Sequence, residues 1–115
     1  MSVQDQTIEI FLDFGITRVY SGFLPLVTLV KHCAYGKPFT HDLVESVAKK
    51  YQISVSTLRQ RIQTIARRMH KTAPLYYEQL SGSIHYHMDT LVLGLADEVL
   101  KRFSQTVSLA LVAQI

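Results

Sequence analysis

The chain has 115 residues, enough for one domain with a single core and too few for two ordinary domains. Hydrophobic residues make up 48% of it and charged residues 18%, a balance that excludes a disordered tail. No apolar stretch reaches the roughly 18 residues of a membrane span, and the opening residues MSVQDQ lack a secretory-signal pattern. The single cysteine, Cys33, cannot form an internal disulfide, so we expect a reducing, cytoplasmic location.

Apolar periodicity predicts two helices in the first third of the chain. Ile8 to Phe14 is typical of a short apolar helix that ends at Gly15. Thr17 or Ser21 is expected to start the next helix, which is largely apolar up to Tyr35 and therefore central and buried. Pro25 is expected in its first turn, where a missing N–H costs little.

A pair of helices is predicted in the middle of the chain. Thr40 is a good N-cap for a helix that ends near Tyr51, and residues 52–54 form a short connection. Ser54 or Ser56 can cap the following helix, which we expect to end near Met69 or His70. Its core-facing residues recur at spacings of three and four: Val55, Leu58, Ile62, Ile65 and Met69.

The last third is expected to contain a short helix, an ambiguous segment and a long helix. Leu75 to Leu80 forms the short helix, and residues 84–87 are compatible with a short extended piece. Asp89 or Thr90 starts the last helix, and its inward residues are expected to be Leu91, Val92, Leu95, Val99, Leu100 and Phe103. The apolar tail 104–115 continues this helix, packs on the body or is buried in a partner chain. Residues 1–115 are thus predicted to form one compact all-α domain of five to six helices that contains a helix-turn-helix.

One segment of the chain is basic without interruption. No Asp or Glu lies between Glu45 and Glu78. This segment contains seven cations, namely Lys49, Lys50, Arg59, Arg61, Arg67, Arg68 and Lys71. A polyanion is the natural partner of such a local positive field, although a solvated basic helix face gives the same pattern.

The helix that begins near residue 55 also carries polar side chains suited to reading DNA. Arg and Gln can bind base edges in the major groove through two hydrogen bonds, and Thr can contact a thymine methyl group. The side chains expected to contact bases are Ser56, Thr57, Arg59, Gln60, Gln63 and Thr64. Those expected to contact phosphates are Lys49, Lys50, Ser54, Arg61, Arg67, Arg68 and Lys71.

Three stretches resemble the C-terminal effector domain of the stage-zero A sporulation response regulators of spore-forming bacteria. The stretch IEIFLDFGITRVYSGFLPL is similar to that family's Ile-x-x-Ile-Gly element followed by a Gly-aromatic-x-x-Leu helix. The stretch LVESVAKKYQISVSTLRQRIQTIARRM is similar to its IAKKF helix and recognition helix, and LADEVLKR is similar to its final VADKLR helix. The order and spacing of these stretches cover about residues 8–102.

The resemblance implies a six-helix fold, dimers arranged in tandem on DNA, and transcriptional control through contact with RNA polymerase. The family's base-reading positions fall on Thr57, Arg59, Gln60 and Gln63. The recognition helix here reads STLRQRIQT, whereas the family is richer in the pattern Arg-x-Glu-Arg-x-x-Arg. The family's DNA target is therefore not carried over.

Other chemistry has little support in the sequence. His85 and His87 have no evident third metal ligand, and Cys33 beside His32 has no third group to orient a nucleophile. We therefore expect no enzyme, no cofactor and no metal. The predicted function is sequence-specific binding of duplex DNA for transcription regulation, by a chain that is a homodimer at least on DNA. The alternative is a helical protein-interaction or dimerisation module that binds no DNA.

Overall fold

The computed structural model describes residues 2–113, and it describes side chains for residues 2–105. Its six helices are α1 (Val3–Asp13), α2 (Phe23–Ala34), α3 (His41–Lys50), α4 (Val55–Thr72), α5 (Pro74–Ser81) and α6 (Met88–Ala113). No strand occurs among residues 2–113. The predicted all-α class with five to six helices is confirmed.

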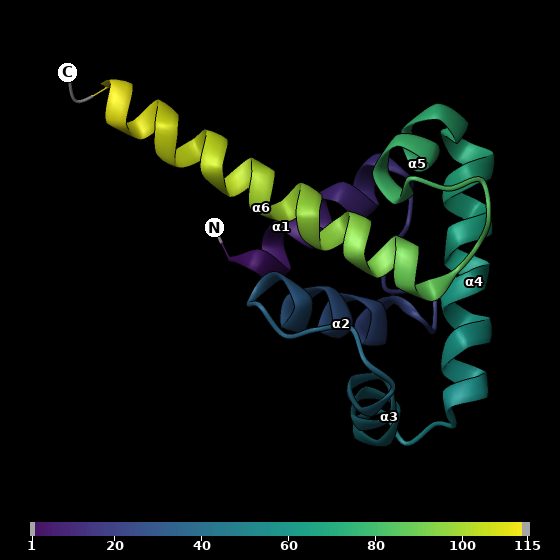
Figure 1. Ribbon diagram of the computed structural model, residues 1–115. Helices are drawn as coiled ribbons and strands as arrows, with labels where there is room; N and C mark the ends of the chain where they lie inside the picture. Colours follow the sequence, from purple (N-terminus) through teal and green to yellow (C-terminus); the bar gives the residue numbers. More distant parts are fainter. Residues whose placement is uncertain (1, 114–115) are drawn as a thin grey trace.

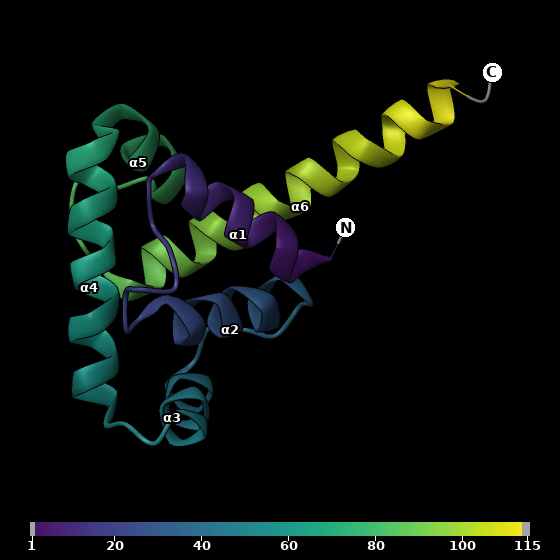
Figure 2. The same ribbon diagram turned by 180° about the vertical axis from the view of Figure 1, so that it is seen from behind.

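The helices form a bundle that is closed on one side by α4. Helix α2 packs along the first part of α6, and α1 packs against both of them (Figures 1 and 2). Helix α4 runs across the ends of α2 and α6, with α3 near its first residues and α5 near its last (Figure 1). One long side of α4 therefore faces away from the rest of the protein.

The core contains side chains from all six helices. The predicted stripe on α4 is confirmed, because Leu58, Ile62, Ile65 and Met69 are at most 1% exposed and Val55 is half-buried. Burial of one such aliphatic side chain contributes about 1.5–3 kcal/mol, so this stripe holds α4 firmly against the bundle.

Two predicted helix starts near the N-terminus are wrong. Helix α1 begins at Val3 and not near Ile8, because Ser2 and Asp5 form a capping box ahead of the apolar residues. Helix α2 begins at Phe23, and neither Thr17 nor Ser21 is its first or capping residue. Its N-cap, Gly22, has no side chain, and a Cβ at this position would lie 2.9 Å from the backbone of Arg61 in α4. The packing of α2 on α4 sets this boundary, and no capping side chain marks it. Pro25 lies in the first turn of α2, as expected.

The remaining boundaries differ from the predictions by a few residues. Helix α4 continues to Thr72, beyond the expected end, and Ala73 then leaves the helical conformation ahead of Pro74. Helix α5 ends at Ser81, and its C-cap, Gly82, has a φ of 69° that suits glycine. Residues 84–87 form a loop and not an extended strand, and α6 starts at Met88, slightly before the predicted residues.

Helix α6 is longer than its packing on the bundle requires. Leu100, predicted to face inward, is 45% exposed, and Phe103 is only half-buried. The inward prediction for Leu100 is wrong because the bundle ends at this point, while the helix continues to Ala113 away from the body (Figures 1 and 2). The tail thus continues the helix over residues 104–113, and residues 114–115 lie outside the described part. Among the described residues, no helix combines the length and apolarity needed to cross a bilayer.

Candidate nucleic-acid interface

A tight connection joins α3 to α4. The Thr40 hydroxyl caps α3 by accepting a hydrogen bond from the Leu43 N–H at 3.2 Å, and the Ser54 hydroxyl caps α4 by accepting from the Thr57 N–H at 3.0 Å. Between them, Gln52 has a φ of 57°, and the Ile53 N–H donates to the Ala48 carbonyl at 3.0 Å. The Ile53–Ala48 bond ends α3 and the Ser54 cap starts α4, so the connection is confined to residues 51–54.

Buried residues hold this pair of helices on the bundle. Ala48 is 2% exposed, and Ile53 is half-buried against the core. The Tyr51 hydroxyl forms a hydrogen bond with the Thr28 hydroxyl of α2 at 2.6 Å. The helix-turn-helix motif itself stays a prediction, because joined helix pairs also occur in bundles that bind no DNA.

Helix α4 has one buried side and one open side. We use the name outer row for the exposed side chains that line the open side, namely Ser56, Gln60, Thr64, Arg67, Arg68 and Lys71. The outer row offers hydroxyl and amide groups near its start and cations near its end. This is the chemical order expected for contacts with bases first and with phosphates further along the helix.

The residues expected to contact bases are divided among different flanks of α4. Gln60 and Thr64 lie on the outer row together with Ser56, and the Thr64 hydroxyl donates to the Gln60 carbonyl at 3.0 Å. Arg59 and Gln63 lie on the flank that faces the starts of α3 and α6. Thr57 is half-buried, and its hydroxyl accepts a hydrogen bond from Ser54. Only part of the set can therefore face one flat ligand at once.

The residues expected to contact phosphates are spread more widely. Arg67, Arg68 and Lys71 form the second half of the outer row, and Lys49 and Lys50 are exposed at the end of α3. Arg61 is half-buried beside the Tyr20–Gly22 loop. The Ser54 hydroxyl is engaged in capping α4, because it accepts from the Thr57 N–H and donates to the Thr57 hydroxyl.

Within residues 2–105, none of the seven cations of the basic segment forms an ion pair. The ion pairs join Lys101 to Asp97 and Arg102 to both Asp13 and Glu98. The imidazoles of His41 and His70 contact the carboxylates of Glu45 and Glu78. The first turn of α4 contains no acidic residue, so the positive end of its dipole is not offset there. The positive potential over α4 is thus available to a ligand.

Sequence reasoning missed a groove beside α4. It has a volume of about 500 Å³, and its walls include Arg59 and Gln63 of α4 together with Thr40 at the start of α3 and Asp89 at the start of α6. The groove could not be found from sequence, because it joins segments about 50 residues apart in the chain.

Sequence reasoning left Lys31 and Lys37 out of the set of candidate cations. Burial and the nearby charges of Lys37, Lys50 and Lys31 lower the pKa of His32. Lys31 and Lys50 line one pocket between α2 and the end of α3. Lys31 and Lys37 precede the acid-free segment in sequence, so they were not counted with it.

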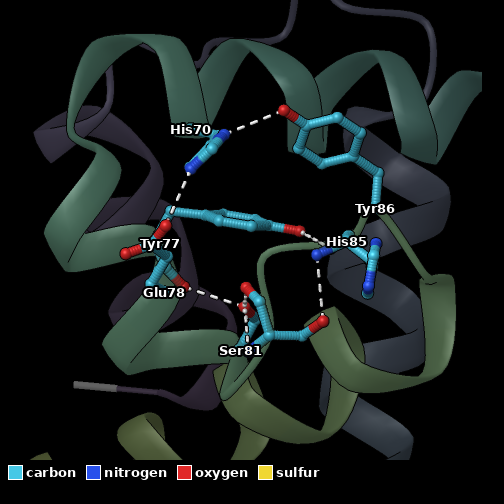
Figure 3. A network of polar contacts seen from close by, with 7 residues as sticks. His70, Tyr77, Glu78, Ser81, His85 and Tyr86 are labelled. Atoms are coloured by element: carbon cyan, nitrogen blue, oxygen red, sulfur yellow. Dashed lines mark hydrogen bonds and ion pairs between the residues drawn. The ribbon is translucent and has the colours of Figure 1, made fainter.

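A network of polar and aromatic contacts fixes the last turns of α4 (Figure 3). The His70 ring contacts the Tyr86 hydroxyl through Nδ1 at 2.8 Å and a Glu78 oxygen through Nε2 at 3.2 Å. The guanidinium of Arg67 lies over the Tyr86 ring at 5.7 Å, and the Tyr77 hydroxyl donates to the His85 carbonyl at 2.7 Å. These contacts join α4 to α5 and to the loop that precedes α6.

The histidines weighed as metal ligands belong to this loop. The rings of His85 and His87 are 5.6 Å apart, and the part of the chain with described side chains has no group of three residues able to hold a metal ion.

Tyr77 is fully buried, and Tyr76 stacks on Phe14 with ring centroids 4.7 Å apart. Both tyrosines are therefore part of the packed interior.

No protein-family model, curated protein or solved structure matches this chain. The resemblance to the sporulation effector domain therefore stays a prediction, and the geometry and charge of α4 are the basis for a functional proposal.

Proposed function

We propose that this protein binds duplex DNA by inserting the open side of α4 into the major groove, and that it regulates transcription in this way. The observation that carries the proposal is the outer row: six exposed polar or cationic side chains without an ion-pair partner among the described residues. A solvated helix face usually mixes both signs of charge, whereas this face has only one.

The dimensions of α4 support the proposal. A helix of 18 residues is about 27 Å long, and a diameter of about 10–12 Å fits a major groove about 12 Å wide. The core stripe and the His70 network hold both halves of α4 on the bundle, so little ordering is needed before contact. Gln60 lies where base edges would be read, and the cations near Lys71 lie where a phosphate backbone would pass.

The proposal assigns different roles to two exposed residues of α4, and binding measurements on two variants separate them. Gln60→Ala is expected to relax sequence preference, because one bidentate base contact contributes about 1–3 kcal/mol of discrimination. Lys71→Ala is expected to weaken binding to all duplexes by a similar factor. The measurement is selection of bound duplexes from a random pool at two salt concentrations, followed by titration of the selected and scrambled sequences.

Lys101→Ala provides the matched control, because Lys101 is also an exposed lysine on a helix surface but is paired with Asp97 and lies outside the basic segment. This variant is expected to bind as the wild type does. The proposal is wrong if no duplex is enriched from the pool, or if Gln60→Ala and Lys71→Ala keep both affinity and preference.

The proposed regulation of transcription includes a contact with RNA polymerase, and this contact rests on the family resemblance alone.

The second candidate function is a protein-interaction module, and the exposed Leu100 on α6 favours it. A chain that self-associates but enriches no duplex would have this second function.

A further inference from the structure

The pocket between α2 and the end of α3 lies where these two helices pack against each other, and no residue of α4 lines it (Figure 1). We call it the lysine pocket, because Lys31 of α2 and Lys50 of α3 line it together with Gln4 of α1, His32 of α2 and Tyr51. Its volume is about 290 Å³. This is close to the lower end of the range of about 300–1,000 Å³ that is typical of small-molecule sites.

The walls of the lysine pocket carry positive charge and no negative charge. No Asp or Glu lines it, and within residues 2–105 neither Lys31 nor Lys50 forms an ion pair. The imidazole of His32 responds to this charge, because burial and the cations of Lys37, Lys50 and Lys31 lower its pKa. A cleft lined by one sign of charge concentrates ions of the opposite sign. An anion is therefore the ligand that this pocket favours.

Contacts within the lysine pocket hold its shape before a ligand binds. The hydroxyls of Tyr51 and Thr28 form a hydrogen bond at 2.6 Å, and the Thr28 hydroxyl donates to the Leu24 carbonyl at 3.0 Å. The Lys50 Nζ lies over the Tyr51 ring, 5.6 Å from its centroid. A cation that is already placed in this way loses less side-chain entropy when it binds a ligand.

We propose that the lysine pocket binds the phosphate group of a small phosphorylated molecule. A phosphate monoester carries a charge of about −1.5 to −2 at pH 7, which matches the charge of the two lysines. Gln4 and His32 can offer further N–H donors to its oxygens, because both line the same pocket. Leu24 and Val27 also line the pocket and provide apolar surface for the organic part of the ligand.

A DNA backbone offers the same phosphate chemistry but matches the charge of the pocket less well. Each backbone phosphate is a diester with a single negative charge, so it leaves one of the two lysines without a counter-charge. None of the outer-row residues lines the lysine pocket. The inference is therefore independent of the proposed binding of DNA by α4.

Nuclear magnetic resonance of the full chain tests the proposal. The amide and imidazole signals are followed while inorganic phosphate, and separately glycerol 3-phosphate, replaces chloride at constant ionic strength. The titrations are made at about pH 7.5, where both probes are mostly dianions. Saturable shifts are expected for the lining residues, with a dissociation constant of about 1 mM. The pKa of His32 is expected to rise, because the bound dianion offsets the charges of the lysines. The signals of His85, which does not line the pocket, should not move.

Three lysine variants show whether the two lining cations form the site. Lys31→Gln and Lys50→Gln are each expected to weaken binding of glycerol 3-phosphate about tenfold or more, because a charged hydrogen bond is lost. Lys49→Gln is the matched control, since Lys49 is also an exposed lysine at the end of α3 but does not line the pocket. It is expected to bind as the wild type does. All three side chains are exposed, so the changes leave the core intact, and circular dichroism verifies the fold.

The proposal is overturned if glycerol 3-phosphate gives no saturable shifts at concentrations up to about 50 mM. It is also overturned if Lys49→Gln weakens binding as much as Lys50→Gln, because the probe would then respond only to diffuse charge. A DNA duplex is titrated in a parallel experiment. If the duplex shifts the His32 signals and glycerol 3-phosphate does not, the DNA backbone is the source of the phosphate and the proposal of a small molecule is wrong. The duplex measurements on Gln60 and Lys71 are separate from these titrations, so failure of this site and failure of DNA binding are distinguishable.

Discussion

Tyr77 links α5 to the loop before α6 through a single buried hydroxyl. The ring is fully buried, the hydroxyl donates to the His85 carbonyl at 2.7 Å, and burial raises the pKa of the phenol. The neutral phenol is therefore the form that the folded protein favours.

Tyr77→Phe is expected to lower the free energy of unfolding by about 1–2 kcal/mol near neutral pH, because the His85 carbonyl loses its donor. The difference from the wild type is expected to shrink above about pH 10, where the unfolded tyrosine ionises while the folded one resists ionisation. Urea titrations at several pH values measure both effects. Tyr35→Phe, at an exposed tyrosine, should leave the free energy of unfolding near that of the wild type. Equal effects of the two changes would contradict this account.

At the residue scale, the sequence predicted the anchoring of α4 better than the surroundings of its polar side chains. The stripe from Leu58 to Met69 follows from periodicity alone, and the structure confirms it. The positions of Arg59 and Gln63 beside the groove depend on α3 and α6, which are distant in sequence. Periodicity describes one helix at a time and carries no information about such neighbours.

Helices α5 and α6 approach each other closely at Gly94. A Cβ at Gly94 would lie 2.1 Å from the Leu80 carbonyl oxygen and 2.9 Å from its carbon, so the missing side chain lets α6 contact the α5 backbone. Glycine within a helix ordinarily costs about 1 kcal/mol relative to alanine. Here packing against α5 outweighs that cost.

Gly94→Ala is therefore expected to destabilise the protein by about 3 kcal/mol, opposite in sign to the usual effect of this change in a helix. The clash is with backbone and not with the end of a flexible side chain, so α5 must move. Thermal denaturation of Gly94→Ala and of Leu93→Ala, an exposed neighbour on the same helix, measures the contrast. A Gly94→Ala protein as stable as the wild type would show that α5 shifts without cost.

Helix boundaries could be predicted from sequence where a capping side chain marks them. Thr40 and Ser54 carry their own capping chemistry, and both helices begin where these residues predict. The start of α2 depends on contact with α4, and the extent of α6 beyond the bundle depends on how many turns the other helices cover. Neither is encoded in a local pattern.

For the molecule as a whole, the arrangement of charge predicts how DNA binding should respond to salt. The acidic residues in ion pairs with Arg102 and Lys101 lie on α1 and α6, whereas the unpaired cations of the basic segment lie on α3 and α4. If about five phosphates are neutralised, the logarithm of the binding constant falls with the logarithm of salt concentration with a slope of about −4.5.

The double variant Arg67→Gln, Lys71→Gln is expected to reduce the magnitude of this slope by about 2, because two phosphate contacts are removed. Fluorescence anisotropy with a labelled duplex at four or five salt concentrations gives the slope. Lys101→Gln is the control and should leave it unchanged. An unchanged slope for the double variant would mean that the DNA contacts another face of the protein.

The contact at Gly22 has a consequence for how this protein could acquire new targets. The start of α2 rests on the main chain of Arg61, at the middle of α4, and main-chain atoms are the same for every amino acid. The support of the helix at this point is therefore independent of the side chains on its open side. Those side chains are free to diversify, in nature or in the laboratory, while the scaffold that presents them stays the same.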